Sequence, residues 1–357
     1  MKIVVNASEL KDVLNKINKL NIKKENSIFI KTNKLNQVEF EIYDNTSVIQ
    51  INSILIDVKV LEHGTAVIPY ELINILIHQS GDSYTITDNE LIYDDGYIKV
   101  LDKVSKVDGF LEIKRKEQLL YMHEYELYRL IKNVSYCAAK DDTRTILTGI
   151  NFDGNRVAAI DGYRIAVSVS NEFNTNKPIT LSKELIKFLN KILNKKSKQL
   201  ISFFLDKTGR YIEMQIGLTC ITSKLIEGDY LKYEDIIPKE YSYKFEIDAR
   251  QFVSKLKTMD KADFGCTNVL KMILNNDSME IIKRLEMAVM SNKININKDY
   301  GNDLPFKIAA NPTYLKQAMT KYDNAIIKFG NDIEPIVISD DMNLDLILPI
   351  KLASRDM

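Results

Sequence analysis

The feature that most constrains this chain is a module that occurs three times along it. A short strand followed by an amphipathic helix begins at Ile3 (IVVNASELKDVLNKI), at Leu120 (LYMHEYELYRLIKNV) and at Phe245 (FEIDARQFVSKLKTM). In each segment apolar residues return every three or four positions, which is the spacing of one helix face. Self-similarity of this kind predicts a chain built from repeated folding units.

A second kind of helix also occurs three times, with start signals at Pro69, at Ser182 and at the Asn311–Pro312 pair. Between the helices, alternating apolar and polar residues broken by Asn, Asp and Gly predict strands. The repeat has a period of roughly 110 to 125 residues, the size of a domain. We expect an α+β fold of three repeated domains, each with two helices packed on an antiparallel sheet. The expected domains are 1–116, 117–240 and 241–357.

Length and composition agree with a multidomain globular protein. A chain of 357 residues exceeds one ordinary hydrophobic core. No apolar run reaches the roughly 18 to 20 residues that span a bilayer, and the start MKIVVNASELKD lacks the pattern of a signal peptide, so we expect a cytoplasmic location. Cys137, Cys220 and Cys266 are scattered without a CxxC pair, so we expect buried thiols rather than disulfides or a metal site.

The net charge is zero, but the charges are unevenly distributed. Residues 182–198 contain six Lys and one acidic residue, and residues 7–24 contain five Lys and two acidic residues. Over the six expected helical segments basic residues exceed acidic ones by nine, so the rest of the chain has the opposite excess. Solvation alone explains one basic stripe such as Lys183, Lys187 and Lys191. The asymmetry across a threefold repeat favours a polyanionic partner.

The size of the repeat indicates which polyanion fits. Twelve helices packed about 9 to 10 Å apart, two from each of six domains, would enclose a bore of roughly 25 Å, which admits a DNA duplex. One chain alone would leave under about 10 Å, so only a dimer could encircle DNA. Half a ring exposes one sheet edge at each end, so we expect a head-to-tail pair. The candidate edge segments are Tyr97–Lys103 and Asn268–Leu274.

Three stretches carry a resemblance to a known family. SKLIEGDYLKYEDIIP, from Ser223 to Pro238, resembles the junction between the second and third domains of bacterial beta clamps. TILTGINFDGNRVAAIDGYRIAVS, from Thr145 to Ser168, looks like the family's Leu-x-Gly and Thr-Asp-Gly-His-Arg-Leu-Ala motifs. LDLILPIK near the end resembles its C-terminal Leu-Pro-Val-Arg signature. The chain therefore resembles the sliding clamps, the beta subunits of bacterial DNA polymerase III, over essentially its whole length.

This resemblance implies three DNA-clamp domains that form half of a closed ring. It implies a homodimer that encircles double-stranded DNA without sequence preference and tethers the replicative DNA polymerase, so that DNA replication becomes processive. The chain would be a non-catalytic processivity factor without a cofactor. An ATP-dependent clamp loader and repair and ligation proteins would bind it through short hydrophobic peptides, and no membrane partner is expected.

The family's peptide pocket is carried over by motif onto the expected second and third domains. It would be an apolar groove with a few polar groups, and we expect Arg164 and Asn311 to orient the peptide backbone. Ile160, Tyr163 and Leu231 depart from the family's usual Thr, His and Pro, so the preferred peptide is expected to differ. The expected lining is Leu147, Ile160, Gly162, Tyr163, Arg164, Ile165, Leu231, Ile236, Asn311, Tyr314, Pro335, Ile347, Leu348, Pro349 and Ile350.

DNA contacts are expected from basic residues on the outer faces of the helices. Because a clamp must slide, these contacts should reach phosphates and read no bases. The expected DNA-binding residues are Lys16, Lys19, Lys24, Arg129, Lys132, Lys183, Lys187, Lys191, Arg250, Lys257 and Lys316.

No catalytic motif stands out in the sequence. It contains no GxxxxGK[ST] phosphate loop, so opening the ring would need a separate loader. His63, His78 and His123 are too scattered for a zinc site, and acidic pairs such as Asp94–Asp95 lie in expected turns. Two other classes stay open: a repeat protein that binds only proteins, and a hydrolase with a carboxylate pair in a cleft. Within the family, a divergent paralogue or a phage or plasmid clamp also stays open.

Overall fold

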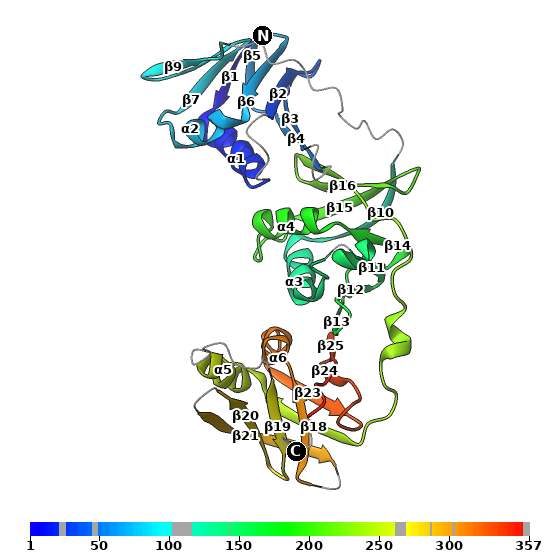
Figure 1. The fold of residues 1–357 in the computed structure, drawn as a ribbon. Helices are drawn as coiled ribbons and strands as arrows, with labels where there is room; N and C mark the ends of the chain where they lie inside the picture. Colours follow the sequence, from blue (N-terminus) through cyan, green and yellow to red (C-terminus); the bar gives the residue numbers. More distant parts are fainter. Residues whose placement is uncertain are drawn as a thin grey trace. The chain divides into compact units, whose positions relative to one another are not determined.

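The chain forms two compact units, each with few helices on large antiparallel sheets, as expected for an α+β fold (Figure 1). Unit 1 comprises Met1–Arg129 and Glu172–Glu227, and unit 2 comprises Leu130–Asn171 and Gly228–Met357. The expected domain boundaries at 116/117 and 240/241 stay a prediction. The computed structural model describes residues 1–20, 26–44, 49–101, 116–141, 143–260, 269–285, 288–301 and 304–352.

Six α-helices lie in the described residues, each within a segment where the sequence predicts one. Two start signals are confirmed, because the side chains of Ser182 and Asn311 accept hydrogen bonds from the amides of Leu185 and Thr313. Pro69 precedes a 3₁₀ turn, Tyr70–Leu72, that leads into α2. The helices are α1 (Ala7–Asn18), α2 (Ile73–His78), α3 (Glu124–Val134), α4 (Lys183–Ile192), α5 (Ala249–Asp260) and α6 (Pro312–Met319).

Unit 1 contains two antiparallel sheets and the strand β14 (Thr175–Leu181). The order of the first sheet is β5 (Val58–Glu62), β1 (Lys2–Asn6), β7 (Ser83–Thr87), β8 (Glu90–Tyr93) and β9 (Gly96–Lys99). The order of the second is β10 (Lys116–His123), β15 (Leu200–Asp206), β16 (Tyr211–Ile216), β17 (Thr219–Lys224), β4 (Ile49–Leu55), β3 (Val38–Asp44), β2 (Ser27–Thr32) and β6 (Thr65–Pro69).

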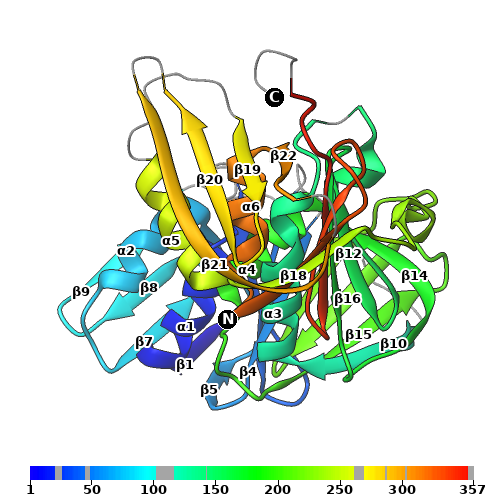
Figure 2. The same cartoon turned by 90° about the horizontal axis from the view of Figure 1, so that it is seen from below.

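In unit 2 the strands follow one another in a single antiparallel order, and α5 and α6 pack side by side against them (Figures 1 and 2). That order is β11 (Ile150–Gly154), β12 (Arg156–Ile160), β13 (Arg164–Val169), β25 (Asn343–Ile347), β24 (Ile336–Ser339), β23 (Asn324–Phe329), β18 (Tyr243–Asp248), β21 (Val289–Tyr300), β20 (Ser278–Arg284), β19 (Leu270–Leu274) and β22 (Phe306–Ala310).

The order of elements repeats, and this repetition shows how the sheets are joined. Each copy is a strand, a helix and three strands, namely β1-α1-β2-β3-β4, β6-α2-β7-β8-β9, β10-α3-β11-β12-β13, β14-α4-β15-β16-β17, β18-α5-β19-β20-β21 and β22-α6-β23-β24-β25. The last strands of different copies pair at two junctions. Within unit 1, β4 pairs with β17, and within unit 2, β13 pairs with β25. At each of these two junctions, the strands of two copies therefore form one continuous sheet.

Two other last strands, β9 and β21, each have an unpaired side within the described part of the chain. β9 is the outermost strand of its sheet, and Val289–Asn295 of β21 pairs only with β20. The expectation that Asn268–Leu274 supplies a sheet edge is wrong, because β19 is paired on both sides, with β20 and with β22. Tyr97 of the other expected segment does lie on the edge strand β9, whereas its residues 102–103 lie outside the described residues.

The cores consist of the apolar faces that the periodicity predicts. Leu10, Leu14 and Ile17 of α1 are fully buried in unit 1, and Phe252 and Leu256 of α5 are fully buried in unit 2. None of the described helices is long and apolar enough to cross a membrane.

The cysteines are partly as expected. Cys137 is buried, and this burial raises the pKa of its thiol well above the usual range, so it stays protonated and unreactive. Cys220 is half-buried rather than buried, and Cys266 lies outside the described residues.

Candidate functional site

A compact apolar cluster, which we call the floor, contains three of the residues expected to line the peptide site. Ile160 at the end of β12 pairs with Ile165 at the start of β13, and Leu147 packs into the same cluster. Tyr233 and Leu346, which were not predicted from the sequence, belong to it as well. All five residues are buried, so they give the site a rigid base rather than a contact surface.

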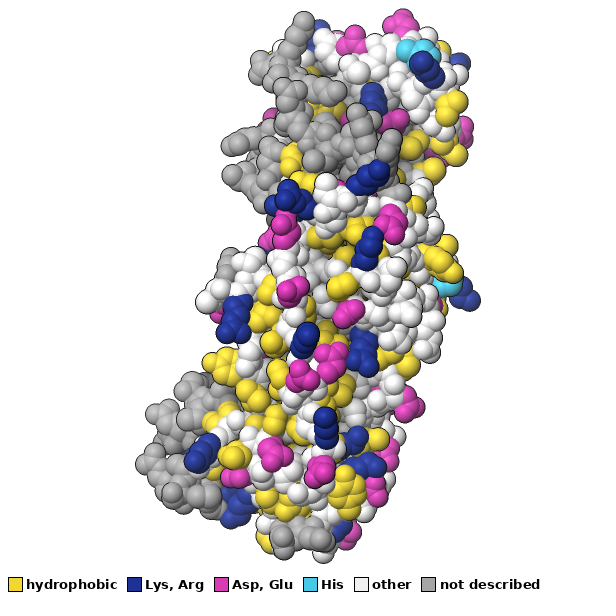
Figure 3. All heavy atoms as spheres, turned by 90° about the vertical axis from the view of Figure 1, so that its right-hand side faces the viewer, with side chains coloured by type: hydrophobic (Ala, Val, Ile, Leu, Met, Phe, Trp, Pro, Cys, Tyr) yellow, Lys and Arg dark blue, Asp and Glu magenta, His cyan; other side chains and the backbone are white. Residues whose placement is uncertain are grey.

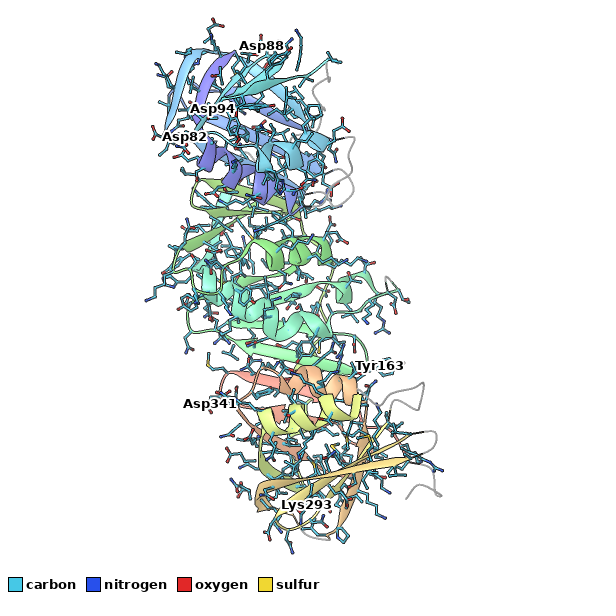
Figure 4. The ribbon with its side chains drawn as sticks, turned by 90° about the vertical axis from the view of Figure 1, so that its left-hand side faces the viewer. Asp82, Asp88, Asp94, Tyr163, Lys293 and Asp341 are labelled. Carbon is cyan, nitrogen blue, oxygen red and sulfur yellow. The ribbon has the colours of Figure 1, made fainter. Side chains whose placement is uncertain are left out.

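Several exposed apolar residues of unit 2 lie close in sequence to residues of this floor. Leu348 directly follows β25 and is 38% exposed, and its amide donates to the carbonyl of Tyr163 at 2.9 Å. Tyr163 itself is 63% exposed (Figure 4). Leu231 and Ile236 are also exposed, and both lie close in sequence to the cluster residue Tyr233. Large exposed apolar side chains beside a buried floor are the features of a peptide-anchoring surface.

The turn between β12 and β13 depends on a glycine. Gly162 has a φ of 89°, in the region that side chains rarely adopt, and a Cβ added there would meet no atom within 4 Å. Backbone conformation rather than crowding therefore selects glycine at this position. The turn is closed by the amide of Asp161, which donates to the carbonyl of Arg164 at 3.3 Å. This geometry projects Tyr163 outward while Arg164 turns inward.

The Arg164 side chain is buried and bound by other residues of unit 2. It is only 5% exposed, and its Nε donates to Asp161 at 2.8 Å while one Nη donates to the carbonyl of Tyr136 at 2.6 Å. The other Nη donates to Gln317 of α6, and the guanidinium lies 4.1 Å from the centre of the Tyr314 ring. The expected role of Arg164 as a direct guide for the peptide backbone stays a prediction; what it does here is hold Tyr314.

The remaining expected lining residues divide into half-buried and buried positions. Asn311 is half-buried, and its side-chain oxygen is occupied as the cap of α6. The amide of Ile350 donates to the carbonyl of Ala309 at 2.7 Å, which ties the segment after β25 to β22. Ile347 is 1% exposed and belongs to the core around α5 and α6. The other half-buried members are Tyr314, Pro335, Pro349 and Ile350.

Unit 2 also contains a buried ion pair that the sequence did not predict. Asp345 of β25 is fully buried and lies 2.8 Å from the Nζ of Lys321, whose side chain is 6% exposed. The hydroxyls of Tyr136 and Tyr322 also donate to Asp345. The sequence did not reveal it, because in LDLIL simple alternation places Asp345 on the face opposite Leu344 and Leu346, where a polar residue usually meets solvent.

The expected DNA-binding residues belong to the helices, but several of them have partners within the protein. Arg129 forms two hydrogen bonds to Glu126, and Arg250 forms two to Asp323. Lys16 donates to Thr219 at 3.4 Å. These contacts pair some of the basic side chains with groups of the protein itself.

The other basic residues differ in exposure. Lys191 donates to the carbonyl of Lys19 at 3.1 Å, although both residues are exposed. Lys132, Lys187 and Lys257 are exposed too. Lys183 and Lys316 are half-buried, and Lys24 lies outside the described residues. Figure 3 draws the side that lies to the right in Figure 1, where strands rather than helices lie, and basic and acidic side chains are mixed there. Because Lys187 and Lys257 are exposed on their helices, we expect them to be the most available of the predicted phosphate contacts.

Among the described residues, no group of three or more His, Cys, Asp or Glu side chains could hold a metal ion. His123 instead stacks on Tyr125, and its Nδ1 lies 3.0 Å from Glu172. The same carboxylate accepts the His123 amide and the Tyr125 hydroxyl, and these hydrogen bonds lower the pKa of Glu172 against the opposing effect of burial. The cluster fastens the start of α3 to the segment after β13.

Comparison with known proteins agrees with the repeated fold. The chain matches the family described as DNA polymerase III beta subunit, central domain, over residues 122–232. The beta sliding clamp of Staphylococcus aureus (strain Mu50 / ATCC 700699) is 26% identical over 241 residues, which are 63% of this chain and 62% of the relative. A Bacillus subtilis DNA polymerase sliding clamp (TM-score 0.85, 18% identity) and a Bartonella birtlesii sliding clamp bound to griselimycin (TM-score 0.82, 15% identity) each cover 99% of this chain and 100% of their own.

The chain therefore has the sliding-clamp fold. Its matched part spans 62% of the length of the Staphylococcus aureus relative. Residues 122–232 match the model of the DNA polymerase III beta subunit's central domain, and 63% of the chain is similar in sequence to the Staphylococcus aureus beta sliding clamp.

Proposed function

We propose that this chain is a sliding clamp that acts as a head-to-tail homodimer. The closed ring encircles duplex DNA in the cytoplasm and holds the replicative polymerase, the clamp loader and other DNA-processing proteins by short hydrophobic peptides. It performs no chemistry and makes DNA synthesis processive by keeping the polymerase near the primer end. The observation that carries the proposal is the repeated sheet junction, which the described part of the chain makes twice, while the two remaining last strands, β9 and β21, stay unpaired with each other there.

The first junction follows a simple rule, counted from the residue that closes each hairpin, which is the first described residue after the turn that pairs or hydrogen-bonds back across it. In the β16–β17 hairpin the closing residue is Thr219, and in the β3–β4 hairpin it is Ile49. Two residues further along each strand lie Ile221 and Ile51, and these two residues pair with each other.

The second junction follows the same rule. Asn343 closes the β24–β25 hairpin through a hydrogen bond to its carbonyl, and Arg164 closes the β12–β13 hairpin in the same way. Two residues further along lie Asp345 and Ala166, and these two also pair. The register is thus the same at both junctions although their residues differ.

The rule gives the register of the missing junction. Gly96 closes the β8–β9 hairpin, and Ala288 closes the β20–β21 hairpin. Ile98 of one protomer should therefore lie opposite Met290 of its partner. Antiparallel pairing then sets Tyr97 opposite Ser291.

The side chains on these strands suit such an interface. Tyr97 is 65% exposed and Val289 is 66% exposed, and Lys99 would lie opposite Val289 in the proposed register. A free sheet edge with exposed apolar residues is a risk for unspecific aggregation unless a partner covers it. Two copies of this chain would cover both edges and close the ring, which explains why the edges carry these residues.

A peptide-binding experiment tests the recruitment role. Leu348→Ala combined with Pro349→Ala should weaken binding of a Gln-x-x-Leu-Phe-type peptide by roughly 30-fold or more, because removing such an anchor costs about 2 to 4 kcal/mol. Calorimetry with the purified protein measures the affinity. Leu218→Ala, which truncates an exposed apolar residue of unit 1, is the control and should bind like wild type. Equal affinities for wild type and the double variant would place the pocket elsewhere.

A charge-reversal experiment tests the DNA role. Lys183→Glu, Lys187→Glu and Lys191→Glu together should reduce retention of the loaded protein on nicked circular DNA at low salt, because they replace phosphate attraction by repulsion. The dimer should persist in sedimentation. The control reverses three exposed lysines outside the helices, Lys207, Lys232 and Lys239, and so makes the same change in net charge. Equal retention of both triple variants would show that α4 does not face DNA.

A further inference from the structure

The buried carboxylate of Asp345 is the centre of a polar network within unit 2. Its two oxygens accept from Tyr136, from Tyr322 at 2.7 Å and from Lys321 at 2.8 Å. The ammonium of Lys321 also donates to the carbonyl of Asn133 at 2.9 Å and to the hydroxyl of Tyr136 at 3.2 Å. All three ammonium donors therefore have acceptors. A fully paired network of this kind has one preferred arrangement and resists movement.

The network joins four elements. Asn133 is in the last turn of α3, and Tyr136 is in the 3₁₀ turn Ser135–Cys137 that follows it. Lys321 and Tyr322 follow α6, and Asp345 is in β25. The end of α3 and the next turn are thereby fixed to the strand that leads into the exposed Leu348.

Tyr136 is the member that also reaches the proposed peptide site. Its backbone carbonyl accepts from Arg164 at 2.6 Å, and its ring centre lies 5.5 Å from the Arg164 guanidinium and 5.4 Å from the Lys321 ammonium. Arg164 in turn lies under the ring of Tyr314. Tyr322 donates to the same carboxylate, but its hydroxyl otherwise lies beside the carbonyl of Ile338, at 3.2 Å. The two tyrosines thus share Asp345 and differ in what lies on their other side.

We propose that Tyr136 is a positioning residue for peptide binding, because its hydroxyl anchors the turn that holds Arg164 beneath Tyr314. The inference rests on the proposed function of the site. Loss of the hydroxyl would leave the Tyr136 ring without its anchor on Asp345, and the acceptor and ring that locate Arg164 would move with the turn. The wall of the peptide site would then lose its fixed position, which lowers affinity without removing any contact to the peptide.

Tyr136→Phe and Tyr322→Phe form a matched pair for the test. Each removes one hydroxyl from Asp345 and keeps the ring, so both should lower the melting temperature to a similar extent. A fluorescein-labelled peptide of the Gln-x-x-Leu-Phe type should bind Tyr136→Phe about fivefold more weakly than wild type, because the order that one hydrogen bond of about 1 kcal/mol gives the free site must then be supplied on binding. The change for Tyr322→Phe should stay under about twofold on the same scale.

A third variant tests the positioning role in a second, independent way. Gln317→Ala removes another acceptor of Arg164 without touching Asp345, and it should weaken the same peptide in the same direction. The Nε–H signal of Arg164 in the NMR spectrum should shift in Tyr136→Phe and in Gln317→Ala but not in Tyr322→Phe.

The outcomes separate this inference from the proposed function. Wild-type affinity in both Tyr136→Phe and Gln317→Ala overturns the positioning role and leaves the peptide site intact. Equal losses in Tyr136→Phe and Tyr322→Phe overturn it as well, because they would reflect stability alone. Failure of the wild-type protein to bind any peptide of this type overturns the proposed function and the positioning role together.

Discussion

A chain carrying Tyr97→Cys and Ser291→Cys is expected to convert almost completely into a covalent dimer under mild oxidation. In the proposed register these residues lie directly opposite each other across an antiparallel pair, where Cα atoms are about 4.5 to 5.5 Å apart. That separation lies within the range of about 4.4 to 6.8 Å that a disulfide accepts. Two such junctions close one ring, so the product should run at twice the chain's mass on a non-reducing gel and return to monomer with reductant.

The offset pair Tyr97→Cys with Lys293→Cys is the matched control. Lys293 lies on the same strand and face as Ser291, but two residues further along, and diagonal neighbours are about 7 to 8 Å apart. Wild type treated with the same oxidant controls for Cys137, Cys220 and Cys266. Equal cross-linking in both designed pairs would refute the register, and a protein that stays monomeric throughout would refute the dimer.

Asp345→Asn should be the most destabilising single substitution that leaves every peptide-contacting residue in place. It takes the only acidic partner from Lys321 in the described network and leaves an ammonium that is 6% exposed without compensation. Removing one member of a buried ion pair typically costs about 3 to 5 kcal/mol. We expect a clear fall in the melting temperature and loss of cooperativity in unit 2, measured by calorimetry.

A control substitution and a second-site substitution separate the effect of the buried charge from that of the chemical change itself. Asp341→Asn makes the same chemical change at an exposed position in the β24–β25 turn and should alter stability by less than about 0.5 kcal/mol (Figure 4). Adding Lys321→Met to Asp345→Asn removes the stranded charge and should restore part of the loss. If Asp345→Asn has the melting temperature of wild type, the ion pair does not stabilise unit 2.

The fold class could be predicted from the sequence because it depends on periodic signals. The apolar stripe of Leu10, Leu14 and Ile17 and the cap signals at Ser182 and Asn311 each identify an element from neighbouring residues alone. The edge strand was harder to predict. The sequences of β9 (GYIK) and β19 (LKMIL) do not say which strand is an edge, and only long-range pairing decides that one is an edge and the other is enclosed.

The candidate site could be predicted only where it follows a motif. The motifs single out the turn from Asp161 to Arg164 and the segment around Leu348, and their role in a peptide site stays a prediction. The inward position of Arg164 depends on Gln317 and Tyr136, which no local pattern connects to it. The link between Tyr136 and Asp345 joins residues 209 positions apart. No periodic pattern in the sequence predicts such a contact, which is known only once the pairing of the strands is known.

Topological linkage to DNA is the most direct test of the central claim. The labelled protein would be placed on nicked circular DNA by a clamp loader, isolated by gel filtration, and the DNA then cut once with a restriction enzyme. A closed ring should stay with the circle and leave after linearisation by sliding off the ends. A protein that stays equally on circular and linear DNA, or that leaves both equally, would contradict the account.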